Sequence, residues 1–127
     1  MIEVNEYVRT KDGVIDKVDA LYGMIENTVH LENKKWFDIK NILKHSKQLI
    51  DLIEVEDIVN KELVIGIIDI TNDKEEIIGK KLITQYRSAQ FTGLDIKHYI
   101  YANDIKTILT KEQFEANCYK VGGEDDN

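Results

Sequence analysis

The stretch EVNEYVRTKDGVIDKV at residues 3–18 is followed later in the chain by a similar one, EVEDIVNKELVIGII at residues 54–68. A single gap aligns the two stretches and places Val14 opposite Val64. One match of this kind can arise by chance in a chain rich in Ile and Lys. A second match in the same order is therefore needed before the similarity indicates a repeated fold.

That second match is present. The segment DIKNIL at residues 38–43 is echoed by DIKTIL at residues 104–109, and the order of the matches is the same in both halves. Two collinear matches favour an internal duplication. We therefore predict one repeat at residues 1–53 and a second at residues 54–121.

Each repeat is predicted to consist mostly of β-strands. In the first repeat, Asp12 and Gly13 form a turn dipeptide that admits positive φ, which predicts a β-hairpin. In the second, LVIGIIDI at residues 63–70 is rich enough in β-branched residues for a strand that is buried on both faces. The second repeat also carries a predicted insertion at residues 70–103. The acidic tail at residues 122–127 has nothing to bury and is predicted to be disordered.

One α-helix is predicted at residues 110–117, because Thr110 and Gln113 can cap its first turn reciprocally, with Phe114 as the apolar anchor. The corresponding segment of the first repeat, residues 45–53, indicates a short helix or a 3₁₀ turn. A short run of strands closed by such a turn is typical of a small SH3-like barrel. We therefore predict a mainly β (α+β) fold of two SH3-like β-barrel repeats, each closed by a short helix or 3₁₀ turn. One larger mixed sheet with pseudo-symmetric halves is the alternative.

The composition indicates a globular protein, with 43% hydrophobic and 32% charged residues and a net charge of −7. No apolar run is long enough to span a bilayer, and the N-terminus lacks the pattern of an export signal, so we expect a cytoplasmic protein without a membrane partner. The negative charge disfavours sequence-independent phosphate binding, although an acidic protein can also block a basic groove by imitating nucleic acid. The single cysteine, Cys118, is expected to be a small buried hydrophobe.

Three segments carry a family resemblance: NEYVRTKDG at 5–13, IKNILKHSKQLIDLIEVED at 39–57 and ILTKEQFEANCYKV at 108–121. They resemble small proteins without an assigned activity that are encoded in prophages and other mobile elements of Gram-positive bacteria. Where those proteins tend to have Gly, this chain has Glu56, a departure that concerns one turn. The resemblance implies a mobile-element setting in a bacterial host and an accessory role, and it provides no catalytic residues.

No pattern of reactive side chains predicts catalysis. The histidines, His30, His45 and His98, lack the spacing of a metal site, and the acidic residues at 69–76 are better explained as a turn than as a calcium loop. Phosphate-binding loops and nucleophile motifs are missing from the sequence. We therefore expect no enzyme, no cofactor and no metal site.

Two sets of aromatic and basic residues are candidates for binding a partner. The first set consists of Trp36, Phe37 and Lys40. It interleaves aromatic and basic side chains, as a surface that stacks bases would, although one of the aromatics is equally explained as core. The second set consists of Tyr86, Arg87, Phe91, Tyr99 and Tyr101. Tyrosine and arginine are enriched in the energetic centres of protein interfaces, so this set favours a protein partner.

The leading hypothesis is a non-enzymatic binding protein of a phage or mobile element. It would inhibit a host nucleic-acid-directed defence enzyme, in the manner of an anti-CRISPR protein, by binding a nuclease or covering its nucleic-acid groove. One alternative is a nucleic-acid-binding small-barrel module that uses Trp36 and Phe37. A second alternative is a small-ligand-binding protein, which would need a cavity with convergent polar side chains.

Overall fold

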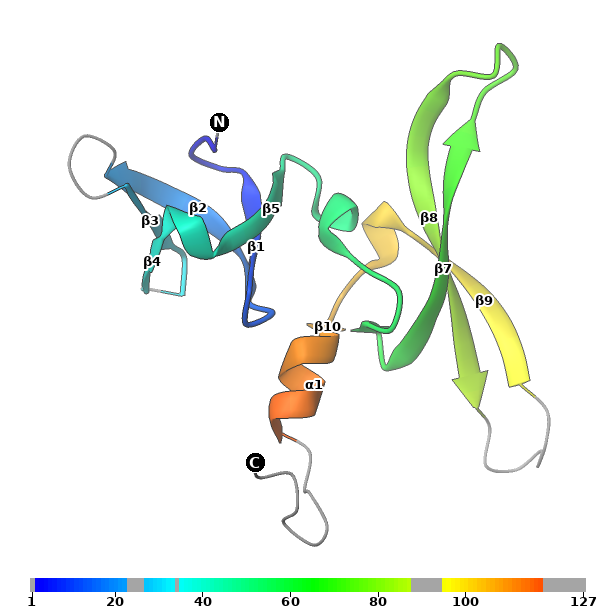
Figure 1. The fold of residues 1–127 in the computed structure, drawn as a ribbon. Helices are drawn as coiled ribbons and strands as arrows, with labels where there is room; N and C mark the ends of the chain where they lie inside the picture. Colours follow the sequence, from blue (N-terminus) through cyan, green and yellow to red (C-terminus); the bar gives the residue numbers. More distant parts are fainter. Residues whose placement is uncertain (1, 23–26, 34, 88–94, 118–127) are drawn as a thin grey trace, which may run out of the picture.

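The computed structural model describes residues 2–22, 27–33, 35–87 and 95–117, and in them it contains two five-stranded antiparallel sheets with a short α-helix (Figure 1). The prediction of a mainly β fold is confirmed. The predicted tail at 122–127 and Cys118 lie outside the described residues.

The first sheet is formed by the N-terminal half of the chain, with the strand order β4-β3-β2-β1-β5. Its strands are β1 (Tyr7–Thr10), β2 (Ile15–Tyr22), β3 (Thr28–Leu31), β4 (Trp36–Asp38) and β5 (Ile42–Ser46). The 3₁₀ helix η1 (Ile39–Asn41) connects β4 to β5, and η2 (Leu49–Leu52) follows β5. The loop between β1 and β2 contains the predicted Asp12–Gly13 turn, in which Gly13 has a φ of 86°.

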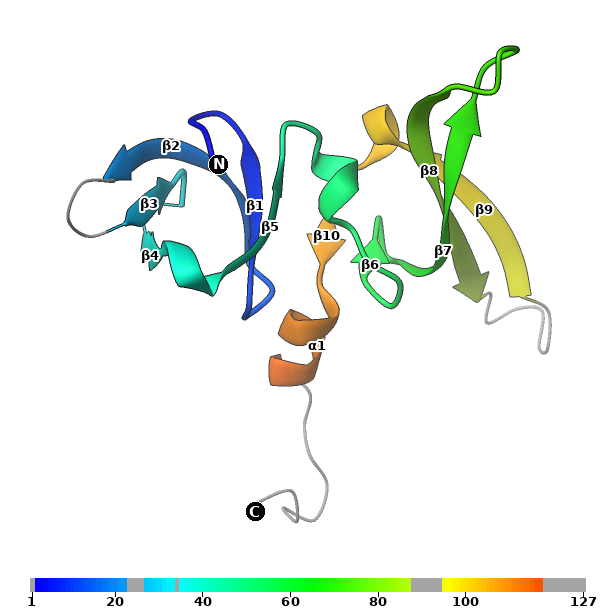
Figure 2. The ribbon, with the colours of Figure 1, turned by 45° about the horizontal axis from the view of Figure 1, so that its top comes forward.

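The second sheet is formed by the C-terminal half, with the strand order β10-β6-β7-β8-β9. Its strands are β6 (Ile58–Val59), β7 (Glu62–Thr71), β8 (Ile77–Arg87), β9 (Asp95–Tyr101) and β10 (Ile108–Leu109). The 3₁₀ helix η3 (Ala102–Asp104) precedes β10, and α1 (Lys111–Asn117) follows it. The β7–β8 hairpin is longer than its counterpart β2–β3 and extends away from the rest of the molecule (Figures 1 and 2).

The two sheets share one topology, because β1 to β5 and β6 to β10 are connected in the same order. Even a bulge is repeated, directly after Val18 in β2 and directly after Val64 in β7. Val18 donates its backbone N–H to Glu6 and Val64 donates to Asp57, each at 2.8 Å. The structural counterpart of Val64 is therefore Val18. The predicted equivalence of Val14 with Val64 is wrong, because the β1–β2 loop is longer than the β6–β7 turn.

The repeated DIK segments are also out of register in the structure. Val8 lies opposite His45 in the β1–β5 pair, and Val59 lies opposite Ile108 in the β6–β10 pair. Ile108 is therefore the counterpart of His45, whereas the alignment of the two DIK segments places Lys111 there. Strands rich in Ile and Lys produce local matches that do not follow structural equivalence.

Each half begins with the same turn, IEVNE at residues 2–6 and IEVED at residues 53–57. Asn5 and Glu56 occupy the same position in it, with φ values of 76° and 83°. A type II turn requires positive φ at this position, which favours Gly or Asn. The turn therefore forms in the second half even though Glu56 is a poor residue for it.

Each half also has its own hydrophobic core. The first consists of Ile2, Val8, Val18, Val29 and Leu31, and the second of Ile50, Ile53, Val59, Val64, Leu82 and Ile100. Ile15 belongs to β2 but packs against the second core. The halves lie side by side, with β10 and α1 between them (Figures 1 and 2).

The α-helix begins as predicted but packs differently. Gln113 donates its backbone N–H to the Thr110 hydroxyl at 3.3 Å, and the Gln113 side chain accepts the Thr110 N–H at 3.1 Å. Phe114 is 48% exposed, so the expectation that it anchors the helix is wrong. The helix is held instead by Thr110, which is buried and donates its hydroxyl to the carbonyl of Gly13 at 2.8 Å.

Candidate interaction surface

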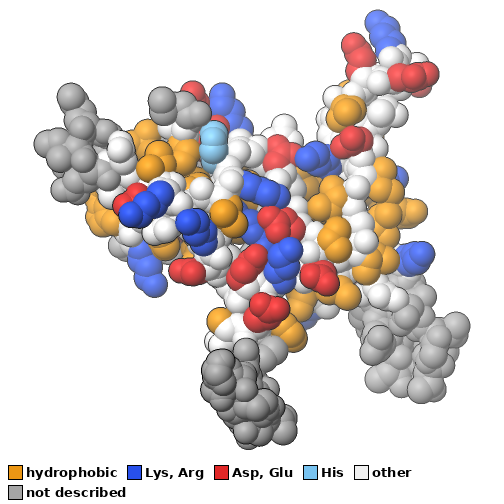
Figure 3. Space-filling model, viewed as in Figure 1, with side chains coloured by type: hydrophobic (Ala, Val, Ile, Leu, Met, Phe, Trp, Pro, Cys, Tyr) orange, Lys and Arg blue, Asp and Glu red, His pale blue; other side chains and the backbone are white. Residues whose placement is uncertain are grey.

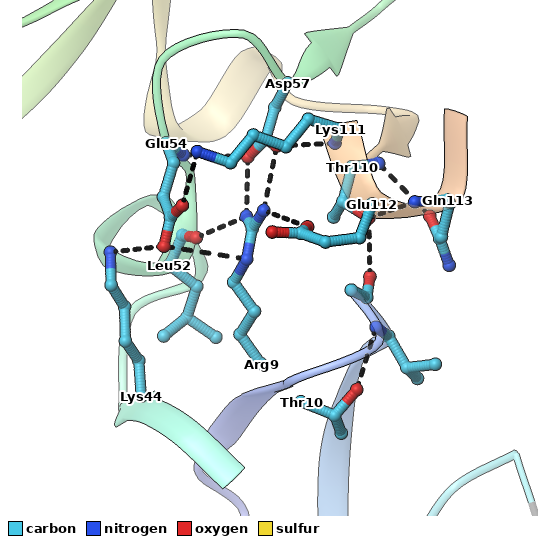
Figure 4. Close-up of polar contacts among 12 residues, drawn as sticks. Arg9, Thr10, Lys44, Leu52, Glu54, Asp57, Thr110, Lys111, Glu112 and Gln113 are labelled. Carbon is cyan, nitrogen blue, oxygen red and sulfur yellow. Dashed lines mark hydrogen bonds and ion pairs between the residues drawn. The ribbon is translucent and has the colours of Figure 1, made fainter. Parts of the chain in front are cut away.

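A buried arginine joins the two halves. The side chain of Arg9, from β1, is completely buried and forms a bidentate pair with Asp57, at 2.6 and 2.9 Å (Figure 4). The same guanidinium donates to Glu112 at 2.7 Å and to the carbonyl of Leu52 at 3.0 Å. All three partners lie outside the first sheet, so Arg9 connects β1 to η2, to the turn before β6 and to α1.

Glu54 forms the outer part of this ionic cluster. Its carboxylate lies 3.0 Å from Lys44 Nζ, 3.1 Å from Lys111 Nζ and 3.7 Å from Arg9 Nε (Figure 4). Partial burial disfavours the charged carboxylate, but the hydrogen bonds from Lys44 and Lys111 outweigh that effect, so the pKa of Glu54 is lowered. Burial likewise opposes the charge of Arg9, yet Asp57, Glu54 and Glu112 together raise its pKa.

The ionic cluster is suited to holding the halves together rather than to catalysis. Its cations and carboxylates face each other, and Asp57 also accepts the backbone N–H groups of Glu54 and Lys111, at 2.7 and 3.0 Å. Arg9 Nε makes no hydrogen bond and lies 3.7 Å from Glu54, but both terminal nitrogens of Arg9 are paired. Buried ion pairs of this kind are costly to separate. The sequence analysis did not single out Arg9. No local signal in the sequence could have identified it, because Val8, Arg9 and Thr10 are all buried and the strand lacks the alternation expected of a half-exposed strand.

The first predicted set of binding residues does not form one patch. Trp36 is 49% exposed on β4 and lies against His30, with ring centroids 4.6 Å apart. Phe37 points to the opposite face and packs against the first core. Side chains alternate along a strand, so these two neighbours cannot share a surface. Lys40 is exposed on η1, 3.9 Å from Asp38.

The second predicted set is partly brought together. Tyr99 and Tyr101 are 56% and 45% exposed on one face of β9. Lys81, on β8, places its ammonium 4.5 Å from the ring centroid of Tyr99 and 5.9 Å from that of Tyr101. Phe91 lies outside the described residues, as do the side chains of Tyr86 and Arg87, whose backbones belong to β8.

The two tyrosines belong to a larger apolar surface that the sequence analysis missed. Strand pairing places Ile83 opposite Tyr99, and Ile68 opposite Lys81, on the side of the sheet that faces away from the second core. We call this surface the outer face; it consists of Leu63, Ile68, Lys81, Ile83, Lys97, Tyr99 and Tyr101. Figure 3 shows hydrophobic side chains gathered over β7, β8 and β9. Leu63 and Ile68 are each at least 40% exposed, so the outer face is accessible to a partner.

A cleft of about 370 Å³ lies between the two halves. Its lining includes Tyr7, Asp16, Lys17, Glu32 and Lys106. The Asp16 carboxylate already accepts the backbone N–H groups of Lys17 and Asn33, each at 2.8 Å, and the Lys17 ammonium lies 5.6 Å from the centroid of the Tyr7 ring. The mixed charges and existing local partners of these groups do not define a ligand class.

Within the described ranges there is no group of three or more His, Cys, Asp or Glu residues that could hold a metal ion. In the same part of the chain no helix is long and apolar enough to cross a membrane. Comparisons with protein families, curated proteins and solved structures find no match. The outer face is therefore the candidate interaction surface of the described chain.

Proposed function

We propose that this protein is a non-enzymatic binding protein that uses the outer face of the second sheet to dock on another protein. One observation carries the proposal: Leu63, Ile68, Tyr99 and Tyr101 are all large, substantially exposed and on the same face of one sheet. Contiguous apolar patches on soluble proteins mark interaction sites, whereas single exposed apolar residues are ordinary.

The composition of the outer face favours a protein partner over nucleic acid. Tyrosine supplies large, rigid contact area and is enriched in interface hot spots. The cations of the outer face are Lys81, which lies over the two tyrosine rings, and Lys97, and the chain as a whole carries a net charge of −7. A phosphate backbone would need several free cations beside the aromatic rings.

The target is proposed to be a nucleic-acid-directed defence enzyme of a bacterial host, as for an anti-CRISPR protein. The resemblance to mobile-element proteins supports this setting. The negative charge supports attraction to the basic surface of such an enzyme, since complementary charge accelerates encounter and selects partners. The outer face would then provide the apolar contacts at the centre of the interface.

In this proposal each half is a small SH3-like barrel. Support comes from the shared strand order, in which β1 and β6 each pair with both the second and the last strand of their half. A 3₁₀ helix precedes the last strand in both halves, and each half has a separate core. Small barrels of this type present exposed strands to partners without needing a pocket.

The experiment measures binding to, and inhibition of, a panel of purified nucleic-acid-directed nucleases by the full chain. The double substitution Tyr99→Ala with Tyr101→Ala should abolish the effect on the nuclease that responds. Leu43→Ala is the matched control, because Leu43 is 51% exposed on β5 of the other sheet, and it should leave binding unchanged. A panel in which no nuclease is bound or inhibited contradicts the proposed target. A target that binds the tyrosine double variant normally contradicts the assigned face.

A further inference from the structure

The edge of β9 is open in the part of the chain that the structure describes. β9 is seven residues long and ends the sheet, pairing with β8 alone. No backbone hydrogen bond from β9 to another described segment is found beyond that pair. An open edge of this length presents unpaired N–H and C=O groups on which a further strand can form.

The interaction of Lys81 with the tyrosines indicates which side chains an added strand would carry. Lys81 of β8 lies directly opposite Tyr101 of β9 and holds its ammonium over the rings of Tyr99 and Tyr101. An added strand on the other side of β9 would place its own side chains at the same cross-strand spacing from Tyr99 and Tyr101. Both rings are about half exposed, so a second cation has access to them.

From this arrangement we infer that the β9 edge binds an extended, basic segment of a partner protein as an additional antiparallel strand. Lys or Arg at the two positions opposite Tyr99 and Tyr101 contact their rings from the side opposite Lys81, and a neutral residue faces Lys97, which is exposed on the same face of β9. The chain's net charge of −7 attracts such a segment. The inference rests on the proposed function, because it gives the outer face a binding mode and its partner a chemistry.

The test uses synthetic peptides and the full chain. A short peptide in which two Lys residues alternate with Thr should bind and shift the backbone amide signals of β9 in NMR spectra. Three matched peptides should bind about tenfold more weakly or not at all. They are a Glu–Thr peptide, a peptide of the same Lys and Thr content arranged in two blocks, and the Lys–Thr peptide methylated at alternate backbone nitrogens on its pairing edge.

Protein variants separate the cation–π contribution from general attraction. The double substitution Tyr99→Leu with Tyr101→Leu keeps a β-compatible apolar face but removes the π systems. It should weaken binding of the Lys–Thr peptide by about tenfold. Trp36→Leu is the matched control on β4, the equivalent strand of the first sheet, and should bind normally. Equal binding of the block or methylated peptide would show charge attraction alone and would overturn the inference.

A second copy of the chain is the competing occupant of the β9 edge. Light scattering at the concentration of the NMR experiment should show a monomer; a dimer that the peptide does not dissociate would overturn the inference. The peptide results do not decide whether the outer face binds a nuclease, because the tyrosine-to-alanine experiment decides that separately. Failure of strand addition can therefore be distinguished from failure of the proposed function.

Discussion

Arg9 is the residue on which the association of the two halves most depends. Its side chain is fully buried, and its main partner, Asp57, is fully buried as well. Replacing Arg9 with Met keeps the size of the side chain but leaves Asp57 charged and without its cation. We expect Arg9→Met to lower the free energy of unfolding by about 3–5 kcal/mol, measured by urea denaturation. The exposed Lys40→Met is the control and should change it by less than about 0.5 kcal/mol.

Changing both members of the pair to apolar residues should not restore stability fully. Asp57 also accepts the backbone N–H groups of Glu54 and Lys111, which would lose their acceptor in an Arg9→Met, Asp57→Leu variant. Full recovery in this double variant would show that these backbone bonds contribute little, and that the cost in Arg9→Met comes from the unpaired carboxylate alone.

The lowered pKa of Glu54 makes stability depend on pH in the acid range. Its ordinary value is 4.5, and Lys44 and Lys111 lower the pKa in the folded state. As pH falls below roughly 5, the unfolded chain takes up the proton first, so the contribution of Glu54 to stability is full above that pH and is lost below it. Glu54→Gln should therefore be less stable than the wild type at pH 7.

The difference in stability between the two proteins should shrink as the pH falls below 4.5 and through the lowered folded-state pKa of Glu54, because the carboxylate is then progressively protonated. Urea denaturation at a series of pH values measures this difference. A gap between the wild type and Glu54→Gln that stays constant down to pH 3 would mean that charge pairing is not its cause.

Side-chain positions differ in how well the sequence alone predicts them. Tyr99 and Tyr101 were chosen as candidates by residue type, and the structure places both exposed on one face of β9. The burial of Arg9 did not follow, because nothing local in YVRT shows that a carboxylate far along the chain, Asp57, supplies its partner. The outer face was missed because residues 63–70 were predicted to be buried on both faces, and that prediction is wrong: Leu63 and Ile68 are exposed, since no element of the described chain covers this side of the sheet.

At the level of elements, the turns that open the two halves differ in quality. Asn5 tolerates positive φ, whereas Glu56 holds a φ of 83° with a β-carbon present. We expect Glu56→Gly to raise the free energy of unfolding by about 1 kcal/mol, because it relieves this strain. Thermal or urea unfolding measures the gain. Asn5→Gly is the control at the equivalent position and should give a smaller gain, since Asn is already suited to it.

The register of the repeat is an element-level property that the sequence determines only loosely. The predicted Asp12–Gly13 hairpin and the Thr110 cap are both present, because each depends on a few neighbouring residues. The equivalences of Val14 with Val64 and of the two DIK segments were wrong, because they relied on letters shared by Ile- and Lys-rich strands. Bulge position and strand pairing decide the register, and neither is visible without the partner strand.

At the scale of the whole molecule, the two halves share one topology but contact each other closely. Ile15 of β2 packs against the second core, and Thr110 donates to the carbonyl of Gly13 in the β1–β2 loop. A β-carbon added to Gly13 would clash with the Thr110 hydroxyl oxygen. The first sheet is therefore held by α1 and by the turn before β6, while β8 and β9 lie on the far side of the molecule, away from this contact (Figure 1).

This coupling predicts that the two sheets unfold together. Trp36 is the single tryptophan, so its fluorescence reports on the first sheet, while hydrogen exchange of the β7 and β8 amides reports on the second. Leu31→Ala removes a fully buried side chain from the first core and should cost about 2–5 kcal/mol. Because the Arg9 cluster and Ile15 link the halves, both probes should show this loss. A loss confined to Trp36 fluorescence would mean that the second sheet is stable without the first, and the outer face could then act as a separate binding unit.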